Sequence, residues 1–384
     1  MVKKICAITG SRAEYGVISA LLKKIKQSKK LKLILVACNM HLQKKYGYTI
    51  KEIEKDNLKI DFKIKNHSNS LKDIDIIDAF SLGTSKFGKV LKKINPDLVL
   101  LTGDRYEMLS AAISSAYLNI PIAHIHGGEV THGSLDDYNR HMITKLSNLH
   151  FAATKLAKNR IIQLGENPKY VHHVGGLGSY NLYEEKLLKK AEIEKELKIK
   201  LLSHNILITI HPEILKHKKE LISKIKILMK SLKFFKKSFK IFTASNSDLG
   251  GDIINREISN FVKKDKNSIF IKSLGKKRYF SIMNLMTCVV GNSSSGLLEA
   301  PMFKVPVINI GDRQSGREVS QSIINVAYDK KKIIKAIQKV TTSQFKKKIK
   351  KIKNFYFKKN TLENILFILE ESKFKFGLKK FYDL

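Results

Sequence analysis

The chain has 384 residues, of which 43% are hydrophobic, so it is long and apolar enough for two ordinary domains. No stretch reaches the roughly eighteen uncharged apolar residues of a membrane span, and residues 1–10 break too early for a secretory signal. The net charge is +38, but 64 of the 72 basic residues are lysines spread along the whole chain. We therefore expect a cytoplasmic protein with no membrane partner and no specific nucleic-acid partner.

Three cysteines, Cys6, Cys38 and Cys288, are scattered through apolar stretches of the chain. Their spacing fits neither a disulfide framework nor a metal site, and no standard zinc or calcium motif is present. The sequence thus predicts a reducing environment, no metal and no other cofactor.

Short apolar runs alternate with longer amphipathic segments along the chain. In the first half the predicted strands are Ile5–Thr9, Leu33–Cys38, Leu98–Thr102, Ile120–Ile125, Phe151–Ala153 and Val171–Val174. In the second half they are Ile206–Ile210, Phe239–Ala244, Ile269–Ile271, Cys288–Val290 and Val305–Ile310. Because the segments between them are long enough for helices, the pattern indicates repeated βαβ units and parallel sheets.

The two halves meet at a cluster of glycines. Gly175, Gly176 and Gly178 precede a highly charged, helix-like stretch at 182–198, and we place a hinge at these glycines. The predicted fold is α/β, with two doubly wound Rossmann-like domains that face each other across a cleft. We assign residues 1–175 to the first domain, 176–360 to the second, and 361–384 to a helical C-terminal segment for which a return to the first domain is one option.

Two predicted strands of the first half end in short polar motifs. The first runs into GSRAEYG, residues 10–16, where a turn opens a helix whose N-terminus attracts anions and Arg12 stands beside it. The third runs into GDRYE, residues 103–107, which places Asp104 at the carboxyl end of the strand. Asp104 could simply cap the next helix, but we favour a functional role because the other strand ends point to the same edge.

The densest group of ionisable residues follows the fourth predicted strand. The stretch HIHGGEVTHGSLDDYNRH, residues 124–141, holds four histidines, three carboxylates and one arginine. Asp136 and Arg140 share one face of the predicted helix, and Ser134 with Asp137 resembles a capping box. A capped surface helix would explain Asp137 alone, but the whole cluster predicts chemistry.

Polar residues also follow the strands of the second half. His211 follows the first of them, and Ser245 and Asn246 follow the second. A final motif, GDRQSGR, supplies Arg313 and Arg317, whose fork-shaped donors suit a diphosphate.

The strongest phosphate cradle in the sequence is GNSSSGLLEAP, residues 291–301. Small hydroxyl residues and two glycines begin a helix whose first N–H groups lack partners. Glu299 follows where it could hold a ribose diol. The second half therefore predicts a nucleoside-diphosphate site, and the first half the acid and base groups.

Seven motifs occur in the same order as in one enzyme family. They are GSRAEYG, GDRYE, HIHGGE with DDxxRH, HPE, SNSD, GNSSSG with EAP, and GDRQxGR. Over nearly the whole chain they resemble the hydrolysing UDP-N-acetylglucosamine 2-epimerases of bacterial sialic acid synthesis, and the closely similar enzymes of legionaminic acid synthesis. The resemblance implies a GT-B fold, a homo-oligomer that we expect to be a dimer, and a nucleotide-sugar substrate.

The implied reaction converts UDP-N-acetylglucosamine and water to N-acetylmannosamine and UDP, through a glycal. It needs at least two proton-transfer groups within reach of one sugar ring. By similarity these are the carboxylates Asp104, Glu129 and Asp136, while His211 contacts the departing diphosphate. Some relatives carry glutamate where this chain has His126, so either His126 or Glu129 takes that role.

The resemblance also supplies the binding residues. Together with three further candidates, Arg140, Ser245 and Asn246, the predicted substrate- and nucleotide-binding set comprises Arg12, Ser293, Ser294, Ser295, Glu299 and Arg313. The sugar stays open, because the same reaction on UDP- or GDP-N,N'-diacetylbacillosamine, giving 2,4-diacetamido-2,4,6-trideoxymannose, is an alternative. More distant alternatives are a GT-B glycosyltransferase and a basic nucleic-acid-binding protein.

Overall fold

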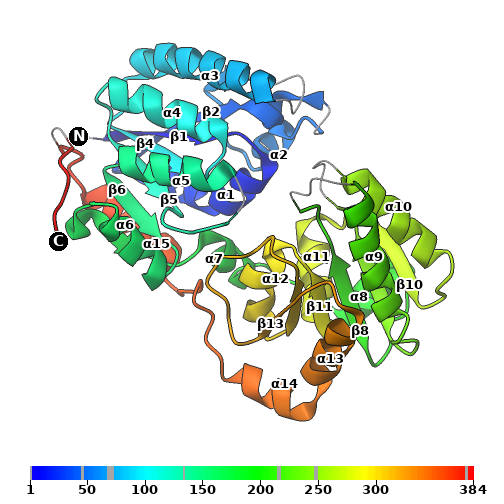
Figure 1. The fold of residues 1–384 in the computed structure, drawn as a ribbon. Coiled ribbons are helices and arrows are strands. Elements are labelled where there is room, and N and C mark those ends of the chain that lie inside the picture. The colour runs from blue at the N-terminus through cyan, green and yellow to red at the C-terminus, as the bar shows by residue number, and fades with distance from the viewer. Residues whose placement is uncertain are drawn as a thin grey trace. The chain divides into compact units, whose positions relative to one another are not determined.

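The computed structural model describes residues 2–44, 47–66, 73–132, 135–213, 218–245, 250–376 and 379–384. The chain forms two compact units (Figure 1). Unit 1 contains Met1–Val130, Ser134–Asn181 and Phe355–Leu384, and unit 2 contains Thr131–Gly133 and Leu182–Asn354.

Unit 1 is built on a seven-stranded sheet in the order β3-β2-β1-β4-β5-β6-β7, and all its pairings are parallel. The strands are β1 (Lys3–Thr9), β2 (Leu31–Cys38), β3 (Phe62–Ile64), β4 (Leu98–Thr102), β5 (Ile122–Ile125), β6 (Leu149–Ala152) and β7 (Val171–His173). Side chains alternate across the sheet, so Ile5 and Ala7 pack into one buried cluster while Cys6 and Ile8 pack into the other.

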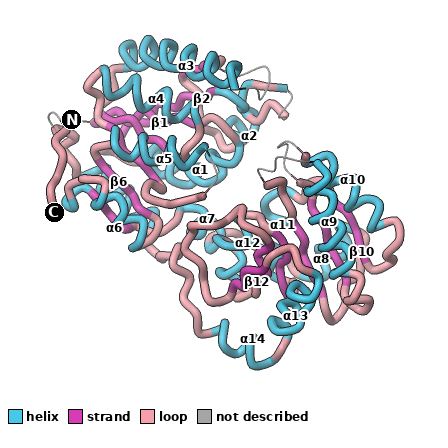
Figure 2. Tube along the Cα trace, in the orientation of Figure 1, coloured by secondary structure: helices cyan, strands magenta, loops and turns pink. Residues whose placement is uncertain are grey.

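Helices cover both faces of this sheet (Figures 1 and 2). One face packs against α1 (Arg12–Gln27), α2 (Ile50–Lys55), α7 (Leu177–Tyr183) and α15 (Thr361–Glu371). The other packs against α3 (Asp73–Ile94), α4 (Tyr106–Tyr117) and α5 (Leu135–Leu146), while α6 (Lys155–Gln163) lies beside β6 and β7. The last helix thus belongs to unit 1, where Lys3 Nζ donates to the carbonyl of Leu369 at 3.2 Å.

Unit 2 contains a six-stranded parallel sheet in the order β10-β9-β8-β11-β12-β13. Its strands are β8 (Asn205–Thr209), β9 (Phe239–Thr243), β10 (Ser268–Ile271), β11 (Cys288–Gly291), β12 (Val307–Ile310) and β13 (Ile323–Val326). One face packs against α9 (Lys218–Leu232), α10 (Gly251–Val262), α13 (Lys330–Thr341) and α14 (Ser343–Lys350). The other packs against α8 (Lys190–Leu197), α11 (Gly275–Asn284) and α12 (Ser294–Leu298).

The strand order of each sheet reverses at one place, between β1 and β4 in unit 1 and between β8 and β11 in unit 2. In open α/β sheets, ligands bind at the carboxyl ends of the strands beside such a reversal. Residues 10–16 and 103–107 follow the two strands of the first reversal, and His211 and residues 291–295 follow those of the second. The topology therefore brings together, within each unit, the motifs that the sequence singles out.

The prediction of two doubly wound α/β sheets is confirmed, and three details differ from it. The sequence did not predict β3 or β13, two short strands at sheet edges in which a polar residue interrupts the apolar run. The helix-like stretch 182–198 is not one helix, since α7 ends at Tyr183 and α8 begins only at Lys190. All three cysteines are buried in strands, as their apolar surroundings indicated.

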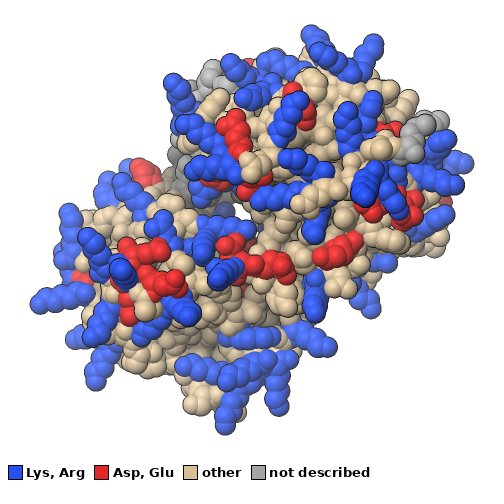
Figure 3. Space-filling model, turned by 180° about the vertical axis from the view of Figure 1, so that it is seen from behind, with Lys and Arg blue, Asp and Glu red and all other residues tan. Residues whose placement is uncertain are grey.

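Basic side chains dominate the surface. The face in Figure 3 carries many lysine and arginine side chains and only a few groups of carboxylates. Among the residues that the structure describes, no helix is long and apolar enough to cross a membrane.

Candidate active site

The end of β1 in unit 1 places a buried carboxyl group at the strand reversal. Ser11 caps α1, and Glu14 completes a capping box by accepting the N–H groups of Gly10 at 2.8 Å and Ser11 at 3.1 Å through Oε2. The other oxygen, Oε1, is buried and has no hydrogen-bond partner among the described residues. Burial, and then the negative charge of Glu107, raise the pKa of Glu14 to about 8.

The end of β4 supplies a second buried carboxylate. Arg105, and not Asp104, is the residue before the first turn of α4. Its Nε donates to Oε1 of Glu107 at 2.8 Å, and Glu107 is fully buried. The charge of Glu107 raises the pKa of Arg105, so the guanidinium stays protonated. The capping role that we weighed for Asp104 is thus absent, and its carboxylate is available for other contacts.

Arg140 on α5 bonds two carboxylates and one backbone carbonyl. It is only 4% exposed, and its Nε and Nη2 both donate to Oδ2 of Asp104, the first at 3.0 Å. Its Nη1 donates to Oδ1 of Asp137 at 2.8 Å and to the backbone carbonyl of Glu129 at 2.8 Å. Arg140 therefore fixes Asp104 and the loop that carries Glu129, and its predicted contact with substrate stays a prediction. The capping box proposed for Ser134 lies outside the described residues.

Asp136, in the first turn of α5, is a carboxylate whose pKa is shifted toward neutrality. Burial, and then the negative charge of Asp104, raise its pKa to about 6. Arg105 and Arg140 oppose this shift. Asp136 and Asp104 are therefore close enough to influence each other, and Asp136 can exchange a proton near neutral pH.

Two histidines, His124 in β5 and His126 in the loop that follows it, have structural partners. His124 is fully buried, and burial lowers its pKa to about 3. Because a carbonyl can only accept, Nε2 donates to Gly103 at 3.2 Å, and Nδ1 of the neutral ring accepts from Thr144 Oγ1 at 3.2 Å. His126 has a left-handed backbone (φ +66), and its Nε2 accepts the N–H of Leu177 at 3.2 Å. Proton transfer by His126 would thus have to use Nδ1.

Arg12 lies at the start of α1, as predicted, and makes a weak ion pair there. Its Nη1 is 3.7 Å from Oε1 of Glu52, and both side chains are about half exposed. A surface pair of this kind contributes little to stability, about 0–1 kcal/mol. The guanidinium is thus available to an anion at little energetic cost.

In unit 2, Asn292 connects the residues around the strand reversal. It is fully buried, and its side chain accepts the N–H of His211 at 2.8 Å and donates to the carbonyl of His211 at 2.9 Å. Its own carbonyl accepts from Arg313 Nη1 at 3.2 Å and from Gln314 Nε2 at 3.0 Å. One amide residue thus sets the backbone of His211 and the side chain of Arg313.

Two serines of the cradle, Ser293 and Ser295, form a cluster of hydroxyl groups with Tyr279. Ser293 Oγ lies 3.0 Å from Ser295 Oγ, which in turn lies 2.6 Å from the hydroxyl of Tyr279. Ser293 precedes α12 but does not cap it with its side chain, and Ser294 is the first residue of that helix. These hydroxyls can donate to or accept from a polar ligand.

Glu299 ends α12 in an apolar setting. Burial raises its pKa to about 7, although the charge of Arg317 opposes the shift. Its Oε2 is buried and has no hydrogen-bond partner among the described residues. A ligand hydroxyl would satisfy this oxygen, as predicted for a ribose diol. Ser245 lies after β9 with its N–H bonded to Asn255, whereas Asn246 lies outside the described residues.

Sequence reasoning missed several of these residues, although most lie inside motifs that it quoted. Glu14 and Glu107 stand in GSRAEYG and GDRYE, and Glu213 stands in HPE. Glu213 Oε1 accepts the N–H of Asp312 at 3.2 Å, and Oε2 meets Lys224 Nζ at 3.1 Å. A carboxylate on the inward face of a helix start was the signal for Glu14, because such a residue is costly to bury without a purpose.

The polar groups at the two strand reversals are carboxyl, guanidinium, hydroxyl and amide groups. Within the described part of the chain, no three His, Cys, Asp or Glu side chains are grouped so that they could hold a metal ion.

Two parallel doubly wound sheets, each with polar side chains at its strand reversal, define a two-domain Rossmann-like protein of the GT-B class. The sequence profile described as UDP-N-acetylglucosamine 2-epimerase matches residues 23–370. The polysialic acid biosynthesis protein P7 of Escherichia coli is 38% identical over all of this chain and 98% of its own length. The chain belongs to the UDP-N-acetylglucosamine 2-epimerase family.

Two other relatives add detail. The hydrolysing GDP/UDP-N,N'-diacetylbacillosamine 2-epimerase of Campylobacter jejuni is 39% identical over 90% of this chain and 89% of its own length. The crystal structure of the Neisseria meningitidis UDP-GlcNAc 2-epimerase bound to UDP-GlcNAc matches 96% of this chain and all of its own with a TM-score of 0.81. At 18% identity, that second likeness concerns the fold alone.

Proposed function

We propose that the protein is a hydrolysing sugar-nucleotide 2-epimerase that converts UDP-N-acetylglucosamine and water to N-acetylmannosamine and UDP. The observation that carries the proposal is the group of carboxylates at the strand reversal of unit 1, where Arg140 holds Asp104 and Asp136 can exchange a proton near neutral pH. The family of the chain and its relatives in polysialic acid and diacetylbacillosamine chemistry support it.

In the first step, a base removes the C2 proton while the bond between C1 and the diphosphate oxygen breaks. The products of this step are UDP and a 2-acetamidoglycal. Asp136 is suited to be the base, since a carboxylate with a pKa of about 6 is ionised at pH 7 yet basic enough to accept a proton. Its neighbour Asp104 is held by Arg140. We assign Asp104 to the same reaction as a second proton-transfer group whose position Arg140 fixes.

In the second step, water adds its oxygen to C1 and a proton returns to C2 on the opposite face. One group must take a proton from the water and another must deliver a proton to C2, and Glu129 and His126, both on the loop after β5, are the candidates for this delivery. We assign the role to Glu129, because Nε2 of His126 is already occupied by the N–H of Leu177. The net reaction consumes one water and releases UDP and the free C2-inverted sugar.

Unit 2 is assigned to the nucleoside diphosphate. Arg313 supplies a guanidinium, and Ser293, Ser294 and Ser295 supply hydroxyls for the phosphate oxygens. Glu299 has a buried oxygen that a ribose hydroxyl would satisfy. His211 follows β8, and we assign its ring to contact with the leaving diphosphate, with Arg12 of unit 1 as a further anion contact. Ser245, and Asn246 beyond the described residues, complete the proposed set.

The diacetylbacillosamine reaction is the second candidate, because the Campylobacter jejuni relative that carries this activity in its name is 39% identical over 90% of the chain. Incubation in deuterated water with UDP-N-acetylglucosamine, and separately with UDP- and GDP-diacetylbacillosamine, distinguishes the two. We expect free N-acetylmannosamine with deuterium at C2, and UDP in equal amount. A product that is still nucleotide-linked, or a free sugar without deuterium at C2, would overturn the proposal.

We further propose that the enzyme works as a cytoplasmic homodimer that uses no metal or nicotinamide, as the resemblance implies. Light scattering on the purified protein tests the dimer, and full turnover after treatment with a chelator tests the metal.

A further inference from the structure

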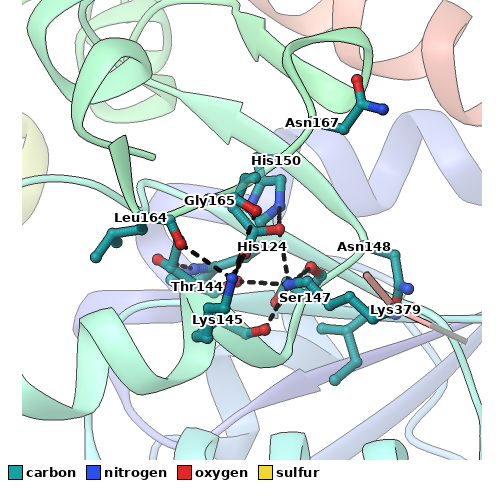
Figure 4. Close-up of polar contacts among 12 residues, drawn as sticks. His124, Thr144, Lys145, Ser147, Asn148, His150, Leu164, Gly165, Asn167 and Lys379 are labelled. Carbon is teal, nitrogen blue, oxygen red and sulfur yellow. Dashed lines mark hydrogen bonds and ion pairs between the residues drawn. The ribbon is translucent and has the colours of Figure 1, made fainter. Parts of the chain in front are cut away.

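The C-terminal tail, residues 379–384, returns to unit 1 and meets the last turn of α5 (Figure 4). Lys379 Nζ donates to the backbone carbonyl of Thr144 at 3.4 Å and to those of Lys145 and Ser147. It also lies 2.7 Å from Oε2 of Glu166. A single ammonium thus gathers the carbonyls at the end of one helix and a carboxylate from another segment.

Glu166 connects the tail to the body of unit 1. It is 3% exposed, and its oxygens meet Nε2 of His150 at 3.1 Å and Nζ of Lys145 at 3.1 Å in addition to Lys379. Burial opposes ionisation, but the bonds from His150 and Lys379 lower the pKa of Glu166. Burial lowers the pKa of Lys379 to about 8, so its charged form predominates at pH 7. Carboxylate and ammonium therefore face each other as an ion pair.

The tail is also seated by apolar and backbone contacts. The N–H of Tyr382 donates to the carbonyl of Gly165 at 3.0 Å, and Lys145 Nζ lies 4.5 Å from the centre of the Phe381 ring. Gly165 has a left-handed backbone (φ +80), and a Cβ there would lie 2.4 Å from the Phe381 ring. Only glycine at this position accommodates the ring, so the seat and the tail fit each other.

The helix that receives the tail carries the candidate active site at its other end. Asp136, Asp137 and Arg140 lie on the first turns of α5. The last turn is linked to the same site by a second route, because Thr144 Oγ1 bonds to His124, and His124 bonds to the carbonyl of Gly103 at 3.2 Å, one residue before Asp104. A shift of the last turn would therefore reach the loop of Asp104.

We propose that Lys379 is a positioning residue for the catalytic carboxylates, and that it acts by holding the carboxyl end of α5. The last carbonyls of a helix lack partners within the helix, and a cation is favoured at that end. Lys379 supplies both the partners and the charge. In doing so it fixes the turn from which Thr144 and His124 support Asp104.

The inference rests on the proposed function only in its kinetic part, since the order of α5 can be measured without substrate. Lys379→Met removes the ammonium and keeps most of the side-chain length, and Lys380→Met on the exposed neighbouring lysine is the matched control for charge. In hydrogen–deuterium exchange, we expect Lys379→Met to exchange faster in residues 141–147 and around Gly103, and Lys380→Met to match the wild type.

In steady-state kinetics, we expect Lys379→Met to lower kcat by about five- to tenfold, because small displacements of catalytic groups are costly, with KM changed less than about twofold. If Lys379→Met does not fold, Phe381→Ala replaces it in the test, because this substitution keeps every charge. We expect Phe381→Ala to speed hydrogen–deuterium exchange in the same turn, but to a smaller extent. Unchanged exchange in α5, or equal effects of Lys379→Met and Lys380→Met, would overturn the inference. Absence of turnover in the wild type would instead contradict the proposed function and leave the exchange result standing.

Discussion

At the strand reversal of unit 1 the polar side chains are mainly ionisable, with the carboxyl groups of Glu14, Asp104, Glu107 and Asp136 around the guanidiniums of Arg105 and Arg140. At the reversal of unit 2 they are mainly neutral amides and hydroxyls, from Asn292, Gln314, the cradle serines and Tyr279. The same sheet topology thus carries two kinds of chemistry. One set of side chains shifts proton affinities, and the other offers directed hydrogen bonds together with the guanidinium of Arg313.

This difference suits the two tasks of the proposed reaction. Proton transfer needs groups whose pKa values are moved toward neutrality, and buried carboxylates close to one another achieve that. Retention of a diphosphate needs donors, and negative charge near it would be repulsive. Unit 2 offers the guanidinium of Arg313 and the hydroxyls of the cradle serines for this task.

The largest expected effect is that of Asp104→Asn. The amide keeps the shape of the side chain but removes the charge that Arg140 holds, and a general acid or base contributes about 10²–10⁴-fold to the rate. We expect turnover to fall by that range, as measured by UDP release. Retention of more than about a tenth of wild-type turnover would remove Asp104 from the reaction.

The next effect concerns unit 2 and uses Asn292→Ala. The substitution leaves the N–H and carbonyl of His211 without their buried partners and loosens the loop that accepts from Arg313. Leaving such groups unsatisfied costs about 1–3 kcal/mol each. We expect KM to rise about ten- to a hundredfold with a smaller change in kcat. A fall in kcat at constant KM would place Asn292 in the chemical step instead.

The pH dependence sharpens the assignment of Asp136. Its pKa is raised to about 6, so as a base it is active above that pH and protonated below it. We therefore expect kcat/KM of the wild type to be level above pH 7 and to fall about tenfold for each pH unit well below 6. A profile that stays level down to pH 5 would contradict the role of Asp136 as base.

The smallest effect is on stability, through Glu299 in unit 2. Its folded-state pKa of about 7 lies above the ordinary value of 4.5, so the ionised form is disfavoured in the folded protein. The destabilisation is absent below about pH 4.5 and grows as the pH rises to about 7. Relative to wild type, Glu299→Gln should thus gain about 2–3 kcal/mol in free energy of unfolding between pH 5 and pH 8. Parallel pH dependence of the two proteins in denaturant titrations would refute this.

The fold was largely predictable because the apolar runs of buried parallel strands are continuous and the intervening segments are long. β3 and β13 escaped prediction: each is short, and a polar residue, Lys63 in β3 and Asn325 in β13, interrupts its apolar run. The break between α7 and α8 also escaped, since a charged stretch predicts helix by composition while packing decides where the helix begins.

The candidate site was predictable where a residue follows a strand, as with Asp104, His211 and Ser293. Which side chains form hydrogen bonds with one another was not predictable. Arg140 and Asp136 are four residues apart on one helix. The hydrogen bonds of Arg140 nevertheless reach Asp104, Asp137 and the carbonyl of Glu129, because distant segments meet at the strand reversal. The contact of Lys379 with the end of α5 lies beyond sequence reasoning for the same reason, since 232 residues separate Lys379 from Ser147.

The central claim is that unit 1 performs the chemistry and unit 2 holds the nucleotide. The most direct test is to measure UDP binding by calorimetry to the wild type, Asp104→Asn and Asn292→Ala under one set of conditions. The account predicts that Asp104→Asn binds UDP within about twofold of wild type, while Asn292→Ala binds it at least about tenfold more weakly. Loss of UDP affinity in Asp104→Asn, with affinity retained in Asn292→Ala, would contradict it.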